Sequence, residues 1–186
     1  MIAWLVAAAW ADATDTVAAR APAPLLGHPV LELRAGVSAD PTGAGASMCA
    51  GVTPVAWLSV EACGSGAGFL YPSDAPDLAH LRARARVGSL RHGKLDLDGF
   101  VGLGVAEAER ADDAPGLVFG RQGGNPVETA GPEAALSVSG RAWLHPRAFA
   151  VVDLTGGAAW MAEAPAVVGS TTELVPFVTL SAGAGF

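Results

Sequence analysis

The chain has 186 residues, a length that favours a single domain, and 51% of them are hydrophobic. Its formal net charge of −7 argues against nucleic acid and anionic membrane surfaces as partners. The sequence is apolar on average, but no run of ~18 residues lacks charged side chains. No transmembrane helix is therefore predicted.

The N-terminus has the composition of an export signal. Met1–Ala11 is continuously apolar and too short to cross a bilayer as a helix. Small residues at alternate positions fit cleavage after Ala11 or Ala13, which predicts a secretory signal peptide over residues 1–11, although its start carries no Lys or Arg. A misassigned start or a buried N-terminal helix is the alternative. Residues 12–27 are rich in Ala and Pro and are predicted to form a flexible leader.

Alternation of apolar and polar residues then begins and recurs along the chain. It predicts strands over Val30–Ser38, Ala44–Val52 and Ser59–Tyr71. The connections at Asp40–Gly43 and Thr53–Leu58 carry Pro and, in the first case, Gly, which favour turns.

The clearest pair of predicted strands lies in the middle of the sequence. After the loop Pro72–Asp77, Leu78–Leu90 and Lys94–Glu109 alternate on both sides of the tight turn Arg91–Gly93. The long polar segment Arg110–Glu133 follows and is predicted to be a loop.

Three more strands are predicted before the chain ends. They are Ala134–Leu144, Ala148–Met161 and Glu173–Phe186. The turn His145–Arg147 and the loop Ala162–Thr172 connect them. The total is eight strands joined by consecutive hairpins.

The last strand carries a family resemblance. One face of it consists of apolar residues that end on an aromatic side chain: Leu180, Ala182, Ala184 and Phe186. This ending resembles that of small bacterial outer-membrane β-barrel proteins. In that group the terminal aromatic residue is part of the signal that the barrel assembly machinery reads, so the resemblance implies this machinery and outer-membrane lipid as partners.

The resemblance and the strand pattern together predict the fold class. We expect an all-β protein, an eight-stranded antiparallel up-and-down transmembrane β-barrel over residues 28–186. With the C-terminal end in the periplasm, the turns near Thr53–Leu58, Arg91–Gly93 and His145–Arg147 face the periplasm. The mostly longer connections then face the outside, as in such barrels.

Charged residues fall on the strand face opposite the apolar one. Five are basic and five are acidic: Arg34, Arg82, Arg84, Arg86, Arg141, Glu32, Glu61, Asp96, Asp98 and Asp153. Equal numbers suit a closed interior, because buried charges must be paired. We therefore predict an interior ion network, with Arg82, Arg84 and Arg86 pairing with Asp96 and Asp98 across the hairpin turn. A solvated strand face or an anion site is the alternative.

The two cysteines support the same register. Cys49 and Cys63 lie at equal distances from the centre of the predicted turn Thr53–Leu58, on the inward face. A cross-strand disulfide is therefore predicted, and an exported chain permits one. Two free buried thiols are the alternative.

Aromatic residues lie near predicted strand ends, as expected of interfacial side chains: Trp57, Tyr71 and Trp160.

No catalytic, cofactor or metal motif stands out from the sequence. The four histidines are scattered, and Gly102 and Gly104 lie inside a strand, so they do not form a phosphate-binding loop. We expect a non-enzymatic outer-membrane barrel with a closed, charge-filled interior that serves a structural or loop-displaying role. A narrow channel is the first alternative, and a soluble secreted barrel that binds a small ligand is the second. The sequence identifies no ligand.

Overall fold

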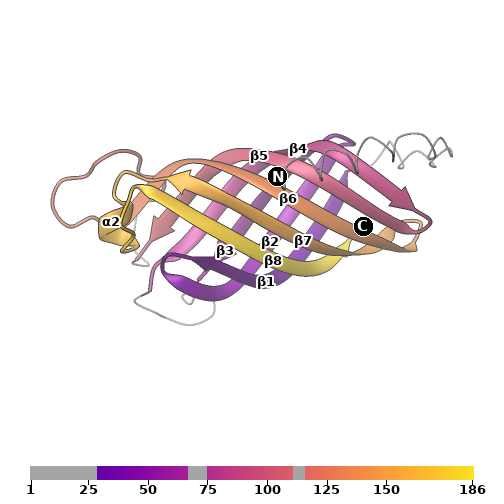
Figure 1. Ribbon diagram of the computed structural model, residues 1–186, viewed down its shortest axis with the longest axis horizontal. Helices are drawn as coiled ribbons and strands as arrows, with labels where there is room; N and C mark the ends of the chain where they lie inside the picture. Colours follow the sequence, from indigo (N-terminus) through magenta and orange to yellow (C-terminus); the bar gives the residue numbers. More distant parts are fainter. Residues whose placement is uncertain (1–28, 67–74, 111–115) are drawn as a thin grey trace, which may run out of the picture.

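The computed structural model describes residues 29–66, 75–110 and 116–186, which form one closed antiparallel barrel. Neighbouring strands in the sequence are neighbours in the barrel, and β8 pairs back with β1 (Figure 1). The strands are β1 (Val30–Asp40), β2 (Gly43–Val55), β3 (Leu58–Ser65), β4 (Asp77–His92), β5 (Leu95–Glu109), β6 (Glu128–His145), β7 (Ala148–Trp160) and β8 (Leu174–Gly185). The predicted eight-stranded up-and-down barrel is confirmed. The predicted signal peptide, the leader and Tyr71 lie outside the described residues.

Every strand directs its alternate side chains to opposite faces, and the apolar face points outward. Leu33, Leu103 and Leu136 are each 60% exposed or more. Their neighbours Arg34 and Glu32 are buried, as are most of the polar residues that alternate with them. A soluble barrel would have the reverse arrangement, with the apolar face inside.

The closure of the barrel uses the end of the chain. Phe186 and Leu31 exchange both backbone hydrogen bonds, at 3.0 Å from Phe186 N to Leu31 O and 2.9 Å in the other direction. The alternate residues of β8 that lead to Phe186 are all exposed on the outer surface: Leu180, Ala182, Ala184 and Phe186. The predicted terminal face is therefore an outward face of the seam between β8 and β1.

Two predicted loops contain regular structure. The segment predicted as the loop Arg110–Glu133 ends early, because β6 begins at Glu128 and pairs over 128–133 with Gly104–Glu109 of β5. Pro and Gly within this stretch concealed the extension. The predicted loop Ala162–Thr172 contains a short helix, α2 (Ala164–Val167), with Pro at its first turn.

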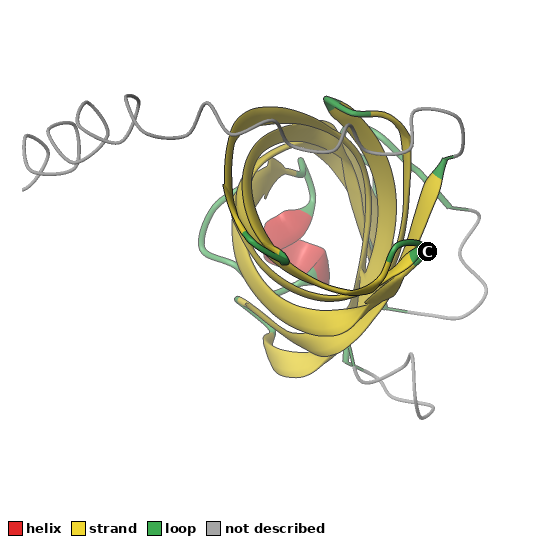
Figure 2. Cartoon of the chain, turned by 90° about the vertical axis from the view of Figure 1, so that its right-hand side faces the viewer, coloured by secondary structure: helices red, strands yellow, loops and turns green. Residues whose placement is uncertain are grey.

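Helix α2 covers one mouth of the barrel. A view along the barrel shows the helix at the far end of the lumen (Figure 2). Its buried residues belong to an apolar cluster with side chains from four strands, which we call the apolar cap: Leu78, Ala106, Ala108, Ala159, Met161, Ala164, Val167, Val168 and Val175. No helix of the described residues is long and apolar enough to cross a membrane.

Candidate functional site

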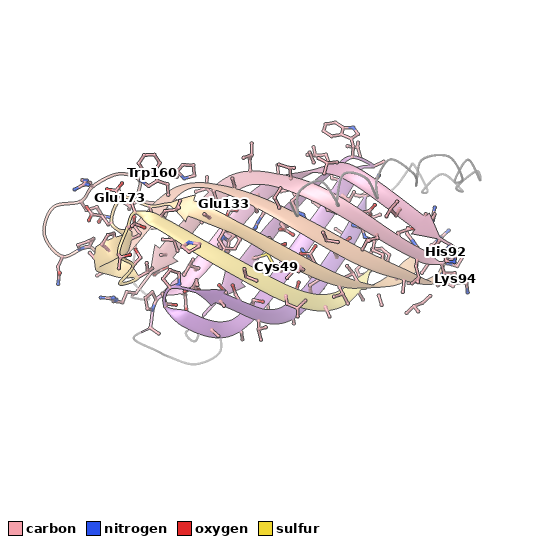
Figure 3. All side chains as sticks on the ribbon, in the orientation of Figure 1. Cys49, His92, Lys94, Glu133, Trp160 and Glu173 are labelled. Atoms are coloured by element: carbon pink, nitrogen blue, oxygen red, sulfur yellow. A yellow bond between two sulfur atoms is a disulfide. The ribbon has the colours of Figure 1, made fainter. Side chains whose placement is uncertain are left out.

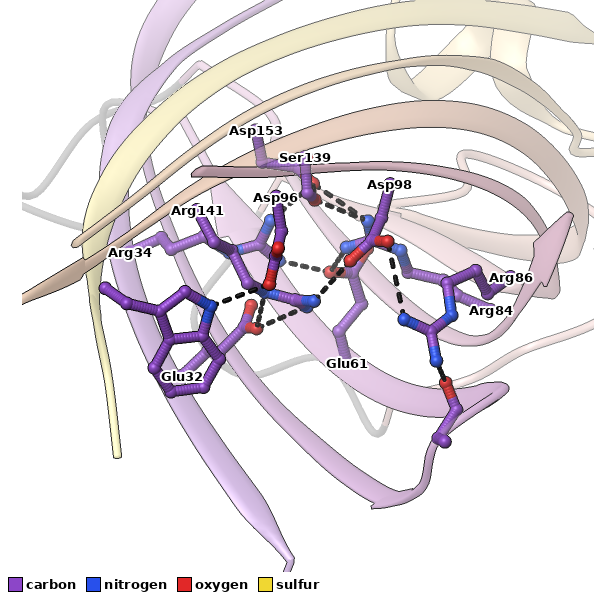
Figure 4. A network of polar contacts seen from close by, with 12 residues as sticks. Glu32, Arg34, Glu61, Arg84, Arg86, Asp96, Asp98, Ser139, Arg141 and Asp153 are labelled. Atoms are coloured by element: carbon purple, nitrogen blue, oxygen red, sulfur yellow. Dashed lines mark hydrogen bonds and ion pairs between the residues drawn. The ribbon is translucent and has the colours of Figure 1, made fainter. Parts of the chain in front are cut away.

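The centre of the lumen holds four charged side chains, which we call the central quartet: Arg34, Glu61, Arg84 and Asp153 (Figure 4). Arg84 bridges two carboxylates, with Nη1 at 2.6 Å from Glu61 Oε2 and Nη2 at 2.8 Å from Asp153 Oδ2. Arg34 does the same from β1, through an ion pair with Glu61 and a 2.9 Å contact between Nη1 and Asp153 Oδ2. Because β3 and β7 are four strands apart in a ring of eight, these pairs span the lumen.

The quartet is buried and supported by its neighbours. All four side chains are at most 4% exposed. Asp153 also accepts hydrogen bonds from Ser139 Oγ and, at 2.6 Å, from Thr155 Oγ1. Buried charges are tolerated when they are paired, and each of the four has an ion-pair partner, while the Nε atoms of Arg34 and Arg84 have no hydrogen-bond partner among the described residues.

Strand β5 makes room for the arginines. The guanidinium of Arg84 lies over the ring of Phe100, 4.5 Å from its centroid. A Cβ at Gly102 would lie 3.5 Å from Arg84 Cγ, and one at Gly104 would lie 2.7 Å from Arg82 Cα. A side chain at Gly104 would therefore collide with the backbone of β4, so glycine is required there for strand approach.

A second group of ion pairs lies nearer the end of the barrel that carries the short turns. Arg141 bridges Glu32 and Asp98, with Nη2 at 2.7 Å from Glu32 Oε1 and Nη1 at 2.6 Å from Asp98 Oδ2. Arg86 Nη1 lies 3.4 Å from Asp98 Oδ1. These contacts join β1, β4, β5 and β6 across the lumen.

The predicted pairing across the β4–β5 hairpin is wrong for two of its three arginines. Arg82 and Arg84 lie opposite Gly104 and Gly102, because the tight turn places Asp96 opposite Arg91 and Asp98 opposite Ser89. Asp96 instead pairs with Arg91, Nε to Oδ1 at 2.7 Å, and accepts a 2.6 Å hydrogen bond from Trp143 Nε1. The register decides which residues face each other on adjacent strands. Arginine side chains are long enough to reach carboxylates on more distant strands, across the lumen.

Two lumen residues were missed by the sequence analysis. His80 Nδ1 lies 2.7 Å from Glu133 Oε2, and both side chains are at most 2% exposed. Arg82 Nε lies 3.3 Å from Glu133 Oε1 and 3.2 Å from Glu61 Oε1, which joins this pair to the central quartet. His80 shares the parity of Arg82 and could have been found by it. Glu133 was hidden by its place in the predicted loop.

The disulfide forms between directly opposed residues. Cys49 and Cys63 are partners in the β2–β3 register, and their Cα atoms are 4.1 Å apart. Cys49 is buried, so the bond lies on the lumen side of the wall (Figure 3). The predicted cross-strand disulfide is present, and it holds the shortest strand of the barrel, β3, to its neighbour.

Two of the aromatics that the sequence predicts to be interfacial are described, and each is 61% exposed, at opposite ends of the barrel. Trp57 is in the β2–β3 turn, and Trp160 ends β7 beside the cap. Trp160 Nε1 and Arg121 Nη2 each donate a 2.6 Å hydrogen bond to the carboxylate of Glu173. These bonds lower the pKa of Glu173 below its ordinary value, and the bond from Trp160 has the largest effect.

Among the described residues, no group of three or more His, Cys, Asp or Glu side chains is arranged to hold a metal ion. The acidic lumen residues are instead held by arginine in the ion pairs given above. What the arrangement does chemically is to neutralise buried charge and fill the lumen with side chains.

Comparison with known proteins shows similarity in structure but none in sequence. No protein family and no curated protein matches the sequence. The structure is similar to Neisserial surface protein A, with a TM-score of 0.52 and 15% identity over 84% of this chain and 94% of that chain. The N-terminal β-barrel domain of OprF from Pseudomonas aeruginosa matches with a TM-score of 0.48 and 14% identity, over 84% of this chain and 97% of that chain.

The fold is therefore that of a small eight-stranded outer-membrane β-barrel, as the C-terminal resemblance implies. The apolar outer face and the charged lumen agree with this, because a lipid bilayer requires that inversion. The outer membrane is the location that both observations support. A soluble secreted barrel does not fit the outward apolar face.

Proposed function

We propose that this protein is a non-enzymatic barrel of the outer membrane whose lumen is closed, and that it serves as a structural or loop-displaying element. One observation carries the proposal: arginine–carboxylate pairs cross the lumen at the central quartet. Eight strands leave an interior that side chains can fill, and here charged side chains fill it. Assembly by the barrel assembly machinery is part of the same proposal and rests on the outward terminal face ending at Phe186.

Further contacts support a closed barrel at the end that carries α2. The apolar cap buries Met161, Ala164 and Val167 completely. Residues of the β5–β6 connection also fold toward the cap, where Gln122 N donates a 2.9 Å hydrogen bond to Glu163 Oε1. An ion that entered the lumen from this side would have to displace both layers.

Planar-bilayer recording tests the closed lumen. We expect the wild-type barrel to give no steady conductance steps. The double variant R84A/D153A removes one charge of each sign from the central quartet, keeps the formal charge unchanged and should produce small steps. A shift in gel migration between heated and unheated samples shows that each barrel is folded.

Steady steps from the folded wild type would contradict the closed lumen and favour a narrow channel. Recovery of the protein from the periplasm without detergent would contradict the membrane location itself. The two experiments therefore test separate parts of the proposal.

A further inference from the structure

The two ends of the barrel carry opposite charge. Outside the lumen at the α2 end, six described acidic side chains that are not buried outnumber the two basic ones, Arg110 and Arg121: Asp40, Asp77, Glu107, Glu109, Glu163 and Glu173. At the opposite end, the described carboxylate side chain outside the central lumen is Asp96, which is already paired with Arg91. The formal charge of −7 for the whole chain conceals this difference.

The end that carries the short turns has a basic rim, formed by Lys94 and Arg147 with His92 and His145. All four side chains are exposed. Lys94 lies in the β4–β5 turn and Arg147 in the β6–β7 turn, and pairing of β5 with β6 brings these turns together. The bond from Trp143 N to Lys94 O, at 2.9 Å, fixes their relation. Figure 3 shows His92 and Lys94 at the end of the barrel opposite Trp160 and Glu173.

The basic rim continues directly from the apolar outer face. Leu90 and Leu95 flank the β4–β5 turn and Leu144 precedes the β6–β7 turn, and all three are exposed. Cationic groups just beyond a lipid-facing apolar band stand at the depth of the lipid headgroups.

We propose that the basic rim binds the headgroups of anionic phospholipids in the periplasmic leaflet. This inference rests on the proposed membrane location. Charge complementarity and depth identify this partner. A phosphodiester headgroup without an ammonium group carries a net negative charge that pairs with Lys94 and Arg147. The leucines beside the rim then contact the acyl chains of the same lipid. The net charge of −7 argues against anionic membrane surfaces as partners. At the basic rim we expect the opposite, because the local charge there is positive and local charge governs contact.

Spin-labelled lipids measure the preference directly. The barrel is reconstituted in phosphatidylcholine vesicles, and the fraction of motionally restricted probe is compared for phosphatidylglycerol and phosphatidylcholine. The test variant is K94Q/R147Q. The matched control, R110Q/R121Q, removes the same formal charge from the opposite end, where Arg110 and Arg121 are exposed.

We expect the wild type and R110Q/R121Q to prefer the anionic probe. K94Q/R147Q should lose most of that preference, by roughly fivefold for each residue at low ionic strength, and added salt should reduce the preference of the wild type. Equal association of both probes with the wild type, or a preference that survives in K94Q/R147Q, would overturn the inference. A heat-shifted band for each sample shows folding and flotation of the protein with the vesicles shows insertion, so failure of the membrane location is distinguished from failure of lipid selection.

Discussion

The two faces of the same strands differ in how they are stabilised. On the outer face, side chains such as Leu103 and Leu136 are largely exposed, as residues that face a lipid bilayer are. On the inner face, Arg34, Arg84 and Asp153 depend on partners from distant strands. A residue on the outer face can therefore be exchanged for another apolar one, while loss of a charged lumen residue leaves its buried partners with less compensating charge.

The largest effect is expected from breaking the central quartet. Arg84→Met leaves Glu61 and Asp153 with one guanidinium fewer, and we expect the free energy of unfolding to fall by about 3–5 kcal/mol. Urea unfolding in vesicles, followed by the loss of the heat-shifted band, measures it. Ala83→Met changes the adjacent outward position and serves as the control. Equal losses in the two variants would show that the quartet does not stabilise the barrel.

A charge placed on the outer face should cost somewhat less. Leu136→Arg puts a guanidinium near the middle of β6, where we expect a loss of about 2–4 kcal/mol. Leu144→Arg places the same group at the basic rim, where the loss should be about 0–1 kcal/mol. The difference between the two variants, measured by the same unfolding assay, locates the bilayer along the strand. Similar losses at both positions would contradict the assigned lipid band.

Removing the disulfide should have a smaller effect. Cys49→Ala with Cys63→Ala opens a loop with a sequence separation of 14, and we expect a loss of about 2 kcal/mol because the unfolded chain gains freedom. Comparing unfolding midpoints of this variant and of wild type unfolded under reducing conditions checks the value. The two should coincide; if reduction leaves the wild-type midpoint unchanged, the bond contributes no stability.

The smallest effect concerns the exposed end of β7. Because Trp160 and Arg121 lower the pKa of Glu173 in the folded state, the ionised carboxylate stabilises this contact above the unfolded pKa of about 4.3. That contribution is lost as the pH falls through the lower folded value. Glu173→Gln should remove this pH dependence, which Trp160 fluorescence can follow in a variant whose other four tryptophans are replaced. An unchanged acid titration of Glu173→Gln would assign the transition to another group.

Much of the architecture could be predicted because each strand shows its own alternation. Both faces of a hairpin and its turn can be predicted from one short stretch of sequence, Leu78–Leu90 with Lys94–Glu109. The N-terminal part of β6 could not be predicted, because Glu128–Glu133 includes Gly131 and Pro132 and lacks the pattern. It is ordered by its partner β5, which supplies the hydrogen bonds that its own composition does not predict.

The sequence by itself determined the alternation, the number of strands, the inward position of the charges and the opposition of Cys49 and Cys63, because these depend on period and turn position along a hairpin. The tertiary structure decided which charges pair. Arg84 contacts Asp153, which lies three strands away in the barrel. His80 contacts Glu133, which follows the long β5–β6 connection in the sequence. Closure of the barrel brings these residues together, and no local pattern encodes distances across a lumen.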